Sequence, residues 1–205
     1  VQEDINSRKG VERIIRFAFD YCKSEPRVDG TTRSRVLLCD KSNAMTYAGS
    51  LWQRVFKQVS AEYPQFKAEH MYVDALCTQM VRDPRQFDVI VTNNMFGDII
   101  SDLGAGLQGG LGMAGSGNIH PGKTSMFEPV HGSAPPLAGK NVANPIGAIL
   151  TAAMMLRHLG LTDEPTRIEA AVLEALRQKQ TTGDVGGALG TREAAEWISN
   201  RVRRF

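Results

Sequence analysis

The first hundred residues alternate between two kinds of hydrophobic pattern. Strands are predicted at 35–40, 67–73 and 87–92, and the first and third of these segments are short apolar runs. Apolar residues at helical spacing are found from Val11 onward, from about 43 to 63, and again up to about 82. Strands that alternate with helices in this way favour an α/β architecture with a largely parallel sheet.

Two of the predicted helices have a clear inward face. In the first helix, the residues that share this face are Val11, Ile14, Ile15, Ala18 and Tyr21 or Cys22. In the second helix they are Leu51, Val55 and Val59. The run "FDVIVT" at 87–92 is apolar throughout, as expected of a strand that is covered on both faces.

The composition and periodicity of the sequence change after Asp102. Residues 104–123 are rich in glycine and weakly periodic, which predicts a crossing between domains. Residues 126–145 form a long predicted loop dense in Gly, Pro and Ala, and loops of this length are usually functional. Beyond it, helices are predicted from Asn144 and Pro145 to Gly160, over about 165–179, and after Thr191 as N-cap.

Composition narrows the class of protein. The 205 residues are 42% hydrophobic and 22% charged, with a formal net charge of +2, which gives no reason to expect nucleic acid or an anionic membrane as a partner. The longest apolar stretch, 145–156, is too short to span a bilayer and suits a buried helix. Cys22, Cys39 and Cys77 are odd in number and predict reduced thiols in a cytoplasmic protein.

Charged side chains follow each predicted strand. Lys41 follows the first strand, Asp74 the second, and Asp98 and Asp102 come shortly after the third. Because parallel strands end at one edge of a sheet, we expect these side chains to converge there, and oxygen ligands favour Mg²⁺ or Mn²⁺ over zinc. Spacing alone leaves a structural alternative open, since acidic residues in a first helical turn also complement the helix dipole.

Two long strings of residues resemble a known family. "FDVIVTNNMFGDIISDLGAGLQGGLGMAGSGNI" (87–119) and "SMFEPVHGSAPPLAGKNVANPIGAILTAAMMLRHLG" (125–160) are similar to the metal-dependent β-decarboxylating dehydrogenases, which act on 3-isopropylmalate, isocitrate, homoisocitrate and tartrate. The resemblance runs from about Val11 to the C-terminus, includes "GDVGG" at 183–187, and is greatest to the 3-isopropylmalate branch. It implies a largely parallel sheet with helices on both faces.

The resemblance implies a metal site and a substrate site. The family's metal-binding aspartates fall on Asp98 and Asp102, and on Asp74 of the partner subunit. The catalytic lysine falls on Lys41, which is also donated across the dimer, and Lys41, Asp74 and Asp98 would contact the substrate. Asn43 is similar to an asparagine near the nicotinamide. The implied enzyme is a homodimer with shared active sites.

The same resemblance implies where the dinucleotide binds. Residues implied to contact it lie in a loop similar to the family's adenine-nucleotide loop and are Glu128, His131, Gly132, Ser133 and Ala134. Asn144 would close on the adenine. Pro136 stands where family members have an aspartate that binds NAD or a lysine that binds NADP. Because no basic residue stands at this position, NAD is the predicted cofactor. Lys140, which is near in sequence, is the residue that could instead favour NADP.

These expectations combine into one predicted function with open alternatives. An NAD-dependent enzyme that uses Mg²⁺ or Mn²⁺ would oxidatively decarboxylate 3-isopropylmalate, a 2-hydroxy acid with a β-carboxylate, in leucine biosynthesis. The alternatives are a tartrate or isocitrate/homoisocitrate dehydrogenase of the same family and a non-catalytic dimerisation fragment. The predicted domains are 1–108, for substrate, metal and dimerisation, and 109–205, the C-terminal part of the nucleotide-binding domain.

The chain also departs from the family pattern. Family subunits are longer than this chain, which begins at Val1, so we expect it to be the C-terminal part of a two-domain subunit whose substrate-binding arginines precede it. Many members have a tyrosine that handles the enol proton upstream of "GVERI". Here Asn6 is in that neighbourhood, and no proton donor is assigned.

Overall fold

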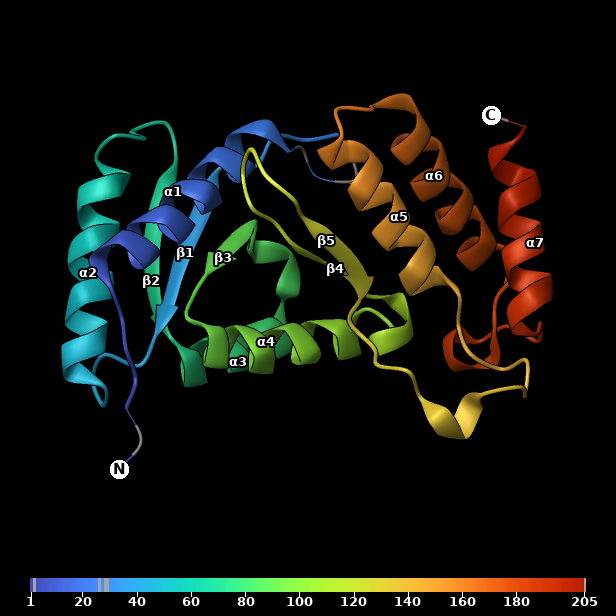
Figure 1. Ribbon diagram of the computed structural model, residues 1–205, viewed down its shortest axis with the longest axis horizontal. Coiled ribbons are helices and arrows are strands. Elements are labelled where there is room, and N and C mark those ends of the chain that lie inside the picture. The colour runs from blue at the N-terminus through green and yellow to red at the C-terminus, as the bar shows by residue number, and fades with distance from the viewer. Residues whose placement is uncertain (2, 26, 28–29, 205) are drawn as a thin grey trace. The chain divides into compact units, whose positions relative to one another are not determined.

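The chain folds into two compact units. The computed structural model describes residues 1, 3–25, 27 and 30–204. Contacts within the chain divide it into two units. Unit 1 comprises residues 1–104 and unit 2 comprises residues 105–205. The division falls inside helix α4 (Asn94–Leu107; Figure 1), and the boundary that the sequence predicts at 108/109 lies just after this helix.

Unit 1 is built around a three-stranded parallel sheet in the order β2-β1-β3. Its strands are β1 (Arg35–Asp40), β2 (Lys67–Tyr72) and β3 (Val89–Val91). At the centre of the sheet, Leu38 of β1 is level with His70 on one neighbour and Val91 on the other. The structure confirms the predicted parallel α/β unit, although β3 is shorter than the predicted 87–92.

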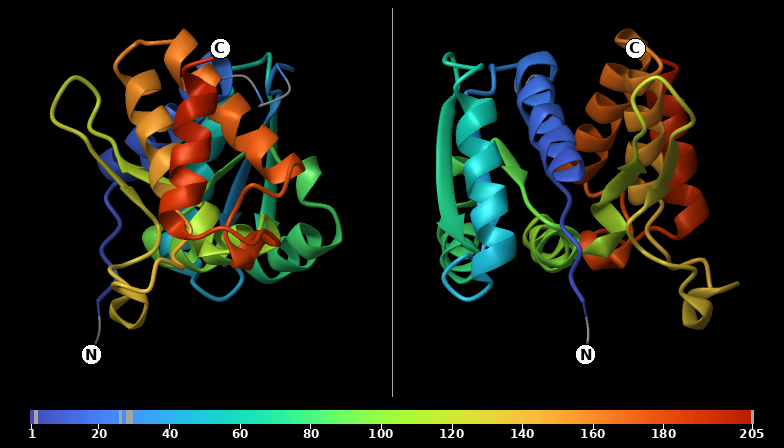
Figure 2. Two further views of the ribbon diagram at one scale, coloured as in Figure 1. Left: turned by 90° about the vertical axis from the view of Figure 1, so that its right-hand side faces the viewer. Right: turned by 60° about the vertical axis from the view of Figure 1, so that its left-hand side comes forward.

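Helices cover both faces of this sheet. They are α1 (Arg8–Ser24), α2 (Thr46–Ser60), α3 (Val73–Arg82) and α4, with a 3-10 turn at Pro84–Gln86. Successive side chains of a strand point to opposite faces. Val36 and Leu38 of β1 therefore join a core with α1 and α2, which lie side by side (Figures 1 and 2). Leu37 and Cys39 join a second core with α3 and α4.

The buried faces of α1 and α2 differ in part from the prediction. In α1 the buried residues are Val11, Ile15, Ala18, Phe19 and Cys22. Ile14 and Tyr21 are 40% and 38% exposed, because they lie at the edges of this stripe rather than within it. α2 begins at Thr46 rather than near 43, and of its predicted inward residues Val55 and Val59 are buried while Leu51 is partly buried. Trp52 and Phe56, which were not predicted, are also buried.

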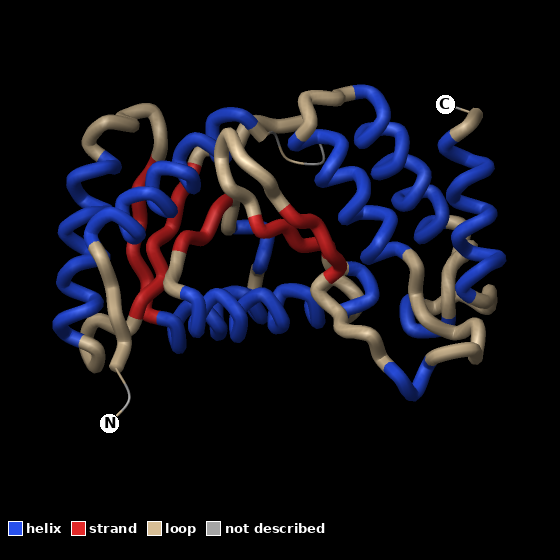
Figure 3. The backbone as a smooth tube through the Cα atoms, in the orientation of Figure 1, coloured by secondary structure: helices blue, strands red, loops and turns tan. Residues whose placement is uncertain are grey.

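Unit 2 combines helices with an antiparallel ribbon (Figure 3). The helices are α5 (Ile146–His158), α6 (Asp163–Arg177) and α7 (Thr191–Val202), and the strands are β4 (Gly115–Asn118) and β5 (Met126–Pro129). The buried core residues of these helices and of the 3-10 turn at Leu111–Met113 are Met113, Ile146, Ala171, Val172, Ala175 and Ile198. None of the helices in the described part of the chain is long and apolar enough to cross a membrane.

The ribbon occupies residues that the sequence assigns to a crossing and a loop, so those two predictions are wrong at β4 and β5. Contacts explain why β4 carries glycines despite being a strand. A Cβ at Gly115 would lie 3.0 Å from the hydroxyl oxygen of Thr151, and a Cβ at Gly117 would lie 3.0 Å from the Phe127 ring. Glycine therefore lets β4 lie close to α5 and β5, and it removes the apolar periodicity that marks other strands.

Side-chain and backbone contacts define the helix ends in unit 2. α5 begins at Ile146 with Pro145 at the N-cap position, so the N-cap predicted at Asn144 is one residue early. The Asn144 side chain still serves the start of the helix, because its Oδ1 accepts a hydrogen bond from Ile146 N at 2.9 Å. Gly160 follows this helix with a left-handed φ of +88°. The prediction for Thr191 is wrong, because it is the first helical residue of α7 and its hydroxyl instead donates to Ala143 O at 2.6 Å.

The cysteines of unit 1 are free thiols. Cys22 and Cys39 are buried, and Cys77 is half-buried. Burial raises the pKa of Cys39 to about 11, so this thiol stays protonated at neutral pH. The predicted reduced state is therefore what the structure contains.

Gly187→Ala is expected to destabilise unit 2. A Cβ at this position would lie 1.9 Å from the backbone oxygen of Thr181, which is fully buried and has no room to move. We expect the free energy of unfolding to fall by about 3 kcal/mol, as at strongly overpacked sites. Thermal unfolding followed by circular dichroism measures the change. Gly183→Ala is the matched control, since a Cβ there meets no atom within 4 Å, and equal melting temperatures of the two variants would contradict this account.

Candidate functional site

Lys41 and Asp74 meet where two parallel strands end. β1 and β2 are paired in register up to Asp40 and Tyr72, so the chain leaves both strands at one edge of the sheet. Lys41 follows β1 directly, and Asp74 lies in the first turn of α3. Lys41 Nζ is 2.5 Å from Asp74 Oδ1. The predicted convergence of these two strand exits is confirmed.

The Lys41–Asp74 pair is accessible to a ligand. The Lys41 side chain is 28% exposed and that of Asp74 is 67% exposed. The Lys41 ammonium lowers the pKa of Asp74, so this carboxylate stays ionised at neutral pH. Lys41 Nζ also lies 5.8 Å from the centroid of the Tyr72 ring, within the range of cation–π contacts. Because exposed ion pairs add little to stability, the pair is better explained as a site for charged ligands.

The residue before Lys41 is the centre of a buried hydrogen-bond network. Asp40 is buried, and its carboxylate accepts hydrogen bonds from Ser42 N at 3.0 Å and Gln53 Nε2 at 3.2 Å. His70 Nε2 lies 2.8 Å from the same carboxylate. Burial raises the pKa of Asp40, but the hydrogen bonds from His70, Ser42 and Gln53 outweigh burial and hold the pKa below its usual value. Sequence reasoning missed this network.

Asp40→Asn is expected to lower stability at neutral pH and to remove part of the acid sensitivity. Because the folded pKa of Asp40 lies below the unfolded value of about 3.9, ionised Asp40 stabilises the fold above that pH. This contribution is lost as the pH falls through the folded pKa. We expect the variant to lose about 2 kcal/mol at pH 7, as for buried hydrogen bonds to a charged group.

Urea unfolding of wild type and Asp40→Asn across the range from pH 7 to about pH 3 measures this difference. The gap between the two proteins should shrink as the pH falls. Asp163→Asn, at an exposed position in the first turn of α6, is the control for loss of one negative charge. A gap that stays constant over the whole range would contradict the role of Asp40.

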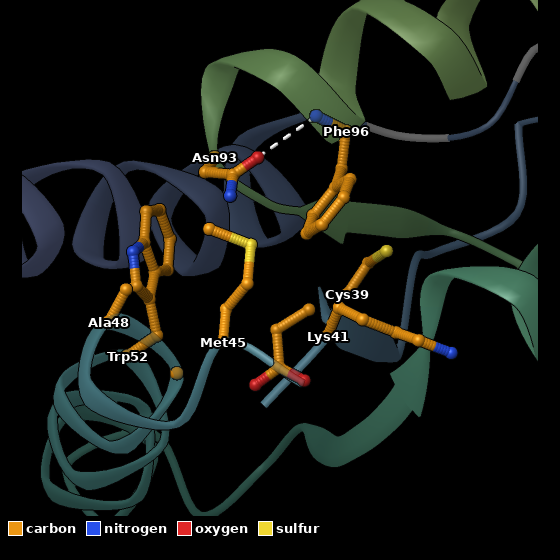
Figure 4. A pocket seen from close by; sticks show the side chains of 9 residues that line it. Cys39, Lys41, Met45, Ala48, Trp52, Asn93 and Phe96 are labelled. Carbon is orange, nitrogen blue, oxygen red and sulfur yellow. Dashed lines mark hydrogen bonds between the residues drawn. The ribbon is translucent and has the colours of Figure 1, made fainter. Parts of the chain in front are cut away.

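A close approach between α2 and the turn after β1 fixes the backbone around Lys41. Gly49 is buried in α2, and a Cβ there would lie 2.3 Å from Ser42 Cβ. Met45 N donates to Lys41 O at 2.8 Å and closes the turn. Figure 4 shows Met45 between Trp52 and Lys41, at a cavity of about 10 Å³, with the Lys41 side chain extending away from Trp52. The turn therefore holds Lys41 outward, toward Asp74.

α4 presents Asp98 and Asp102 to solvent. The helix begins directly after β3, where Asn93 Oδ1 accepts a hydrogen bond from Phe96 N at 2.9 Å (Figure 4). Asp98 and Asp102 are one helical turn apart on one face, and both are exposed. Neither carboxylate has a hydrogen-bond or ion-pair partner among the residues that the structure describes. Two carboxylates at this spacing repel each other unless a cation lies between them.

These two aspartates do not meet Asp74 within one chain. Among the described residues, no three His, Cys, Asp or Glu side chains are grouped so that they could hold a metal ion. The expected convergence of all three aspartates at one edge is therefore wrong for a single chain. Asp98 and Asp102 lie about 6 and 12 Å along α4 from its first residue, away from the strand end. The family resemblance, which assigns Asp74 to the partner's site, does not require them to meet.

Unit 2 contains a cavity of about 650 Å³, which is the size of a small-molecule site. It is lined by most of the loop at 131–144, by Leu111 and Gly112, by Asp184, and by the first residues of α7. Ala134 in this loop has a φ of +44°, a left-handed conformation that residues other than glycine rarely adopt. Conformations of this kind are concentrated at ligand sites.

The cavity contains most of the residues predicted to bind the cofactor, namely His131, Gly132, Ser133, Ala134 and Asn144. Glu128 lies on β5, where it is paired with Ser116, and Asn43 is exposed in the turn after β1 of unit 1. Sequence reasoning missed Asp184 and Arg192, which also line the cavity. The "GDVGG" string could have pointed to Asp184, whereas nothing in the pattern marks Arg192.

Unit 1 thus brings charged residues together at its strand ends, and unit 2 contains a cavity of small-molecule size, two features that are common among enzymes with small-molecule substrates. The sequence model of the Isocitrate/isopropylmalate dehydrogenase family matches residues 2–198, and the chain belongs to this family. It is 46% identical over 203 residues to 3-isopropylmalate dehydrogenase of Thermobifida fusca and 45% identical over 197 residues to that of Streptomyces coelicolor. These alignments cover 98% and 93% of this chain and 55% of each relative.

Solved structures show the same relationship. An isocitrate dehydrogenase from Methylococcus capsulatus is 43% identical with a TM-score of 0.90, over 98% of this chain and 58% of that chain. A β-decarboxylating dehydrogenase from Thermococcus kodakarensis is 36% identical with a TM-score of 0.85, over 100% of this chain and 58% of that chain. The predicted fold class is confirmed, and the chain spans little more than half the length of the relatives it matches.

Proposed function

We propose that this chain carries the metal-binding, catalytic-lysine and adenosine-binding parts of an NAD-dependent enzyme that oxidatively decarboxylates 3-isopropylmalate in leucine biosynthesis. The observation that carries the proposal is the Lys41–Asp74 pair at the ends of β1 and β2. It lies at the two positions where the family resemblance puts the catalytic lysine and a metal-binding aspartate. The names of the relatives at 46% and 45% identity favour 3-isopropylmalate over isocitrate or tartrate as substrate.

Asp98 and Asp102 have the chemistry of a divalent-metal site. Their exposed carboxylates have no partners among the described residues, so no contact has to be broken before a cation binds. Carboxylate oxygens are the ligands that Mg²⁺ and Mn²⁺ prefer, and membership of the family implies a divalent metal. We assign the metal to these two residues together with the partner's Asp74.

Lys41 is the residue we assign as base. When bound, the metal would polarise the hydroxyl oxygen of the substrate and the dinucleotide would accept the hydride from C2. Lys41 in its neutral form would accept the hydroxyl proton at its Nζ atom. Asp74 holds this Nζ atom at the edge of the sheet. No residue is assigned to protonate the enol carbon. Asn6, which has no acidic proton, instead accepts a hydrogen bond from Trp52 Nε1 at 2.9 Å.

The proposed enzyme is a homodimer in which each active site is built from both subunits. α3 and α4 contribute to one core, α3 with Leu76 and Met80 and α4 with Ile100. The large apolar side chains exposed on these two helices are Val81, Met95, Ile99 and Leu107, at 61%, 53%, 54% and 42% exposure. Large apolar side chains that one chain leaves exposed are available for a protein–protein contact. Because the three aspartates do not meet in one described chain, a second copy is the natural source of the third ligand.

The cytoplasm is the proposed location. All three cysteines are free thiols, and unpaired thiols are typical of reducing compartments.

NAD is expected to be a better substrate than NADP, by roughly 10-fold in kcat/KM. The 2′-phosphate of NADP requires a cationic partner, and Pro136 provides none at the position where family members place a lysine. Steady-state kinetics with both dinucleotides measure the ratio. An advantage for NADP would contradict this preference. If that advantage disappeared in Arg192→Gln, the cation at the cavity wall would be its cause.

The function is tested with the protein expressed from its complete gene. With Mn²⁺ present, we expect NADH and CO₂ to form from 3-isopropylmalate at a higher kcat/KM than from isocitrate or tartrate, and we expect EDTA to abolish turnover. A higher value for isocitrate or tartrate would transfer the proposal to that substrate. If the protein dimerises but turns over none of the three acids, the result would support the alternative of a non-catalytic dimerisation fragment.

A further inference from the structure

The "GDVGG" string has no role in the proposed reaction, yet its aspartate reaches into the cavity of unit 2. Asp184 lies in a 3-10 turn at Gly183–Val185. Its Oδ1 accepts a hydrogen bond from Thr182 Oγ1 at 2.6 Å, and its Oδ2 accepts one from Asn144 Nδ2 at 2.9 Å. Thr182 is fully buried, so it holds the carboxylate from the interior side. Asp184 thus connects the interior of unit 2 with a residue of the cavity wall.

Asn144 is held between two groups of opposite hydrogen-bonding character. Its Oδ1 accepts from the backbone N–H of Ile146 at 2.9 Å, and its Nδ2 donates to Asp184. A carboxylate can only accept, and a backbone N–H can only donate. A rotated amide would face both partners with the wrong atom. The two contacts therefore fix which end of the Asn144 amide is the donor.

The backbone next to this pair leaves it no room to rearrange. A Cβ at Gly112 would lie 2.8 Å from Asn144 Cβ and 3.3 Å from Asp184 Oδ2. Gly112, Asn144 and Asp184 all line the same cavity. Asn144 Nδ2 carries two hydrogens, and Asp184 takes one of them. The other protein contact of Nδ2 is Met113 Sδ at 3.6 Å, which is a weak acceptor that a ligand can replace.

We propose that Asp184 is a positioning residue for nucleotide binding. By fixing the Asn144 amide, it makes the cavity present an N–H donor to a hydrogen-bond acceptor of the bound nucleotide, such as a ring nitrogen of adenine. The inference rests on the proposed function in one respect, namely that this cavity takes the adenosine half of the dinucleotide. It adds that the base is recognised through an acceptor, and that Asp184, which orients the Asn144 donor, lies outside the loop at 131–144.

The test compares three variants of the protein expressed from its complete gene, with ADP-ribose as the probe. Affinity is measured by isothermal titration calorimetry and stability by thermal unfolding. Asp184→Ala removes the acceptor of Asn144, and we expect affinity to fall by about 10-fold or more, the effect of one lost hydrogen bond. Asp184→Asn keeps an acceptor oxygen toward Asn144 while its amide donates to Thr182, so we expect affinity near wild type.

The exchange variant Asn144→Asp/Asp184→Asn separates positioning from structural support. In it, the carboxylate introduced at position 144 would accept from Ile146 N and from the amide introduced at position 184. Every internal hydrogen bond is therefore rebuilt, and the one between positions 144 and 184 is reversed in direction. We expect a melting temperature near that of Asp184→Asn but affinity as low as that of Asp184→Ala, because residue 144 no longer donates.

Wild-type affinity in the exchange variant or in Asp184→Ala would overturn the positioning role while leaving the proposed function intact. Affinity lost in Asp184→Asn as severely as in Asp184→Ala would also overturn it, since charge rather than orientation would then be the cause. A wild-type protein that does not bind ADP-ribose would overturn the cofactor part of the proposed function, and this inference with it.

Discussion

Lys41→Ala and Asp98→Ala subunits, each inactive alone, are expected to regain activity when they are mixed and allowed to exchange. In a shared-site dimer, Lys41 serves the partner's site and Asp98 serves its own. One site of the heterodimer then carries both substitutions, and the other carries neither. We expect each heterodimer to have about half the turnover of a wild-type dimer, since only one of its two sites is intact. Subunit exchange followed by assay with 3-isopropylmalate, NAD and Mn²⁺ measures it.

The structure supplies a matched control for this experiment. Lys41 and Asp74 form an ion pair within one chain, at 2.5 Å, so both should be delivered to the same neighbouring site. A mixture of Lys41→Ala and Asp74→Ala subunits should therefore stay inactive, because each site of the heterodimer lacks one of the two residues. Activity in this mixture, or a Lys41→Ala/Asp98→Ala mixture that stays inactive after proven exchange, would contradict the shared-site dimer.

Asp102→Asn is expected to lower turnover by at least about 100-fold while leaving the fold unchanged, since even the partners that orient metal ligands are worth about 10- to 100-fold. The side chain is exposed, and its carboxylate has no hydrogen bond or ion pair among the described residues that the substitution could break. The change removes one of the anionic ligands that we propose for the divalent cation. Turnover titrated with Mn²⁺ gives the apparent metal affinity and the limiting rate.

Asp163→Asn is the matched control for this substitution, because Asp163 is also an exposed aspartate on a helix but lies in unit 2, outside the proposed metal site. It should leave the Mn²⁺ dependence of turnover as in wild type. If Asp102→Asn has the same Mn²⁺ titration as Asp163→Asn, the assignment of Asp102 as a metal ligand is wrong. The unfolding curve of Asp102→Asn should coincide with that of wild type.

Hydrophobic spacing was sufficient for the fold of unit 1 but not for the ribbon of unit 2. β1 is apolar because both of its faces are covered, and that property is visible in the sequence itself. β4 could not be found this way, because contacts with Thr151 and Phe127 require glycine at alternate positions of the strand. Those contacts join different secondary-structure elements, and they cannot be predicted from hydrophobic spacing along the chain.

The candidate site likewise contains residues that the sequence pattern predicts and residues that it does not. Lys41 and Asp74 were predictable because each follows a predicted strand, and parallel pairing brings the positions after such strands together. The Asp40 network was not predictable, because it depends on the register that sets Leu38 opposite His70 and on the approach of Gln53 from α2. The roles of the site residues in metal, substrate and cofactor binding stay predictions until the variants described above are measured.

The wall of the cavity in unit 2 keeps two residues other than glycine in left-handed conformations, Ala134 at φ +44° and Asn141 at φ +54°. Glycine would adopt this region without strain, but it would also leave the free loop many more conformations. Asn141 is held in place because its side chain accepts from Arg192 N at 3.0 Å and donates to Glu193 at 3.0 Å. The wall is thus preorganised: its entropy is lost when the chain folds, so a ligand that enters spends little of its binding free energy on ordering the loop.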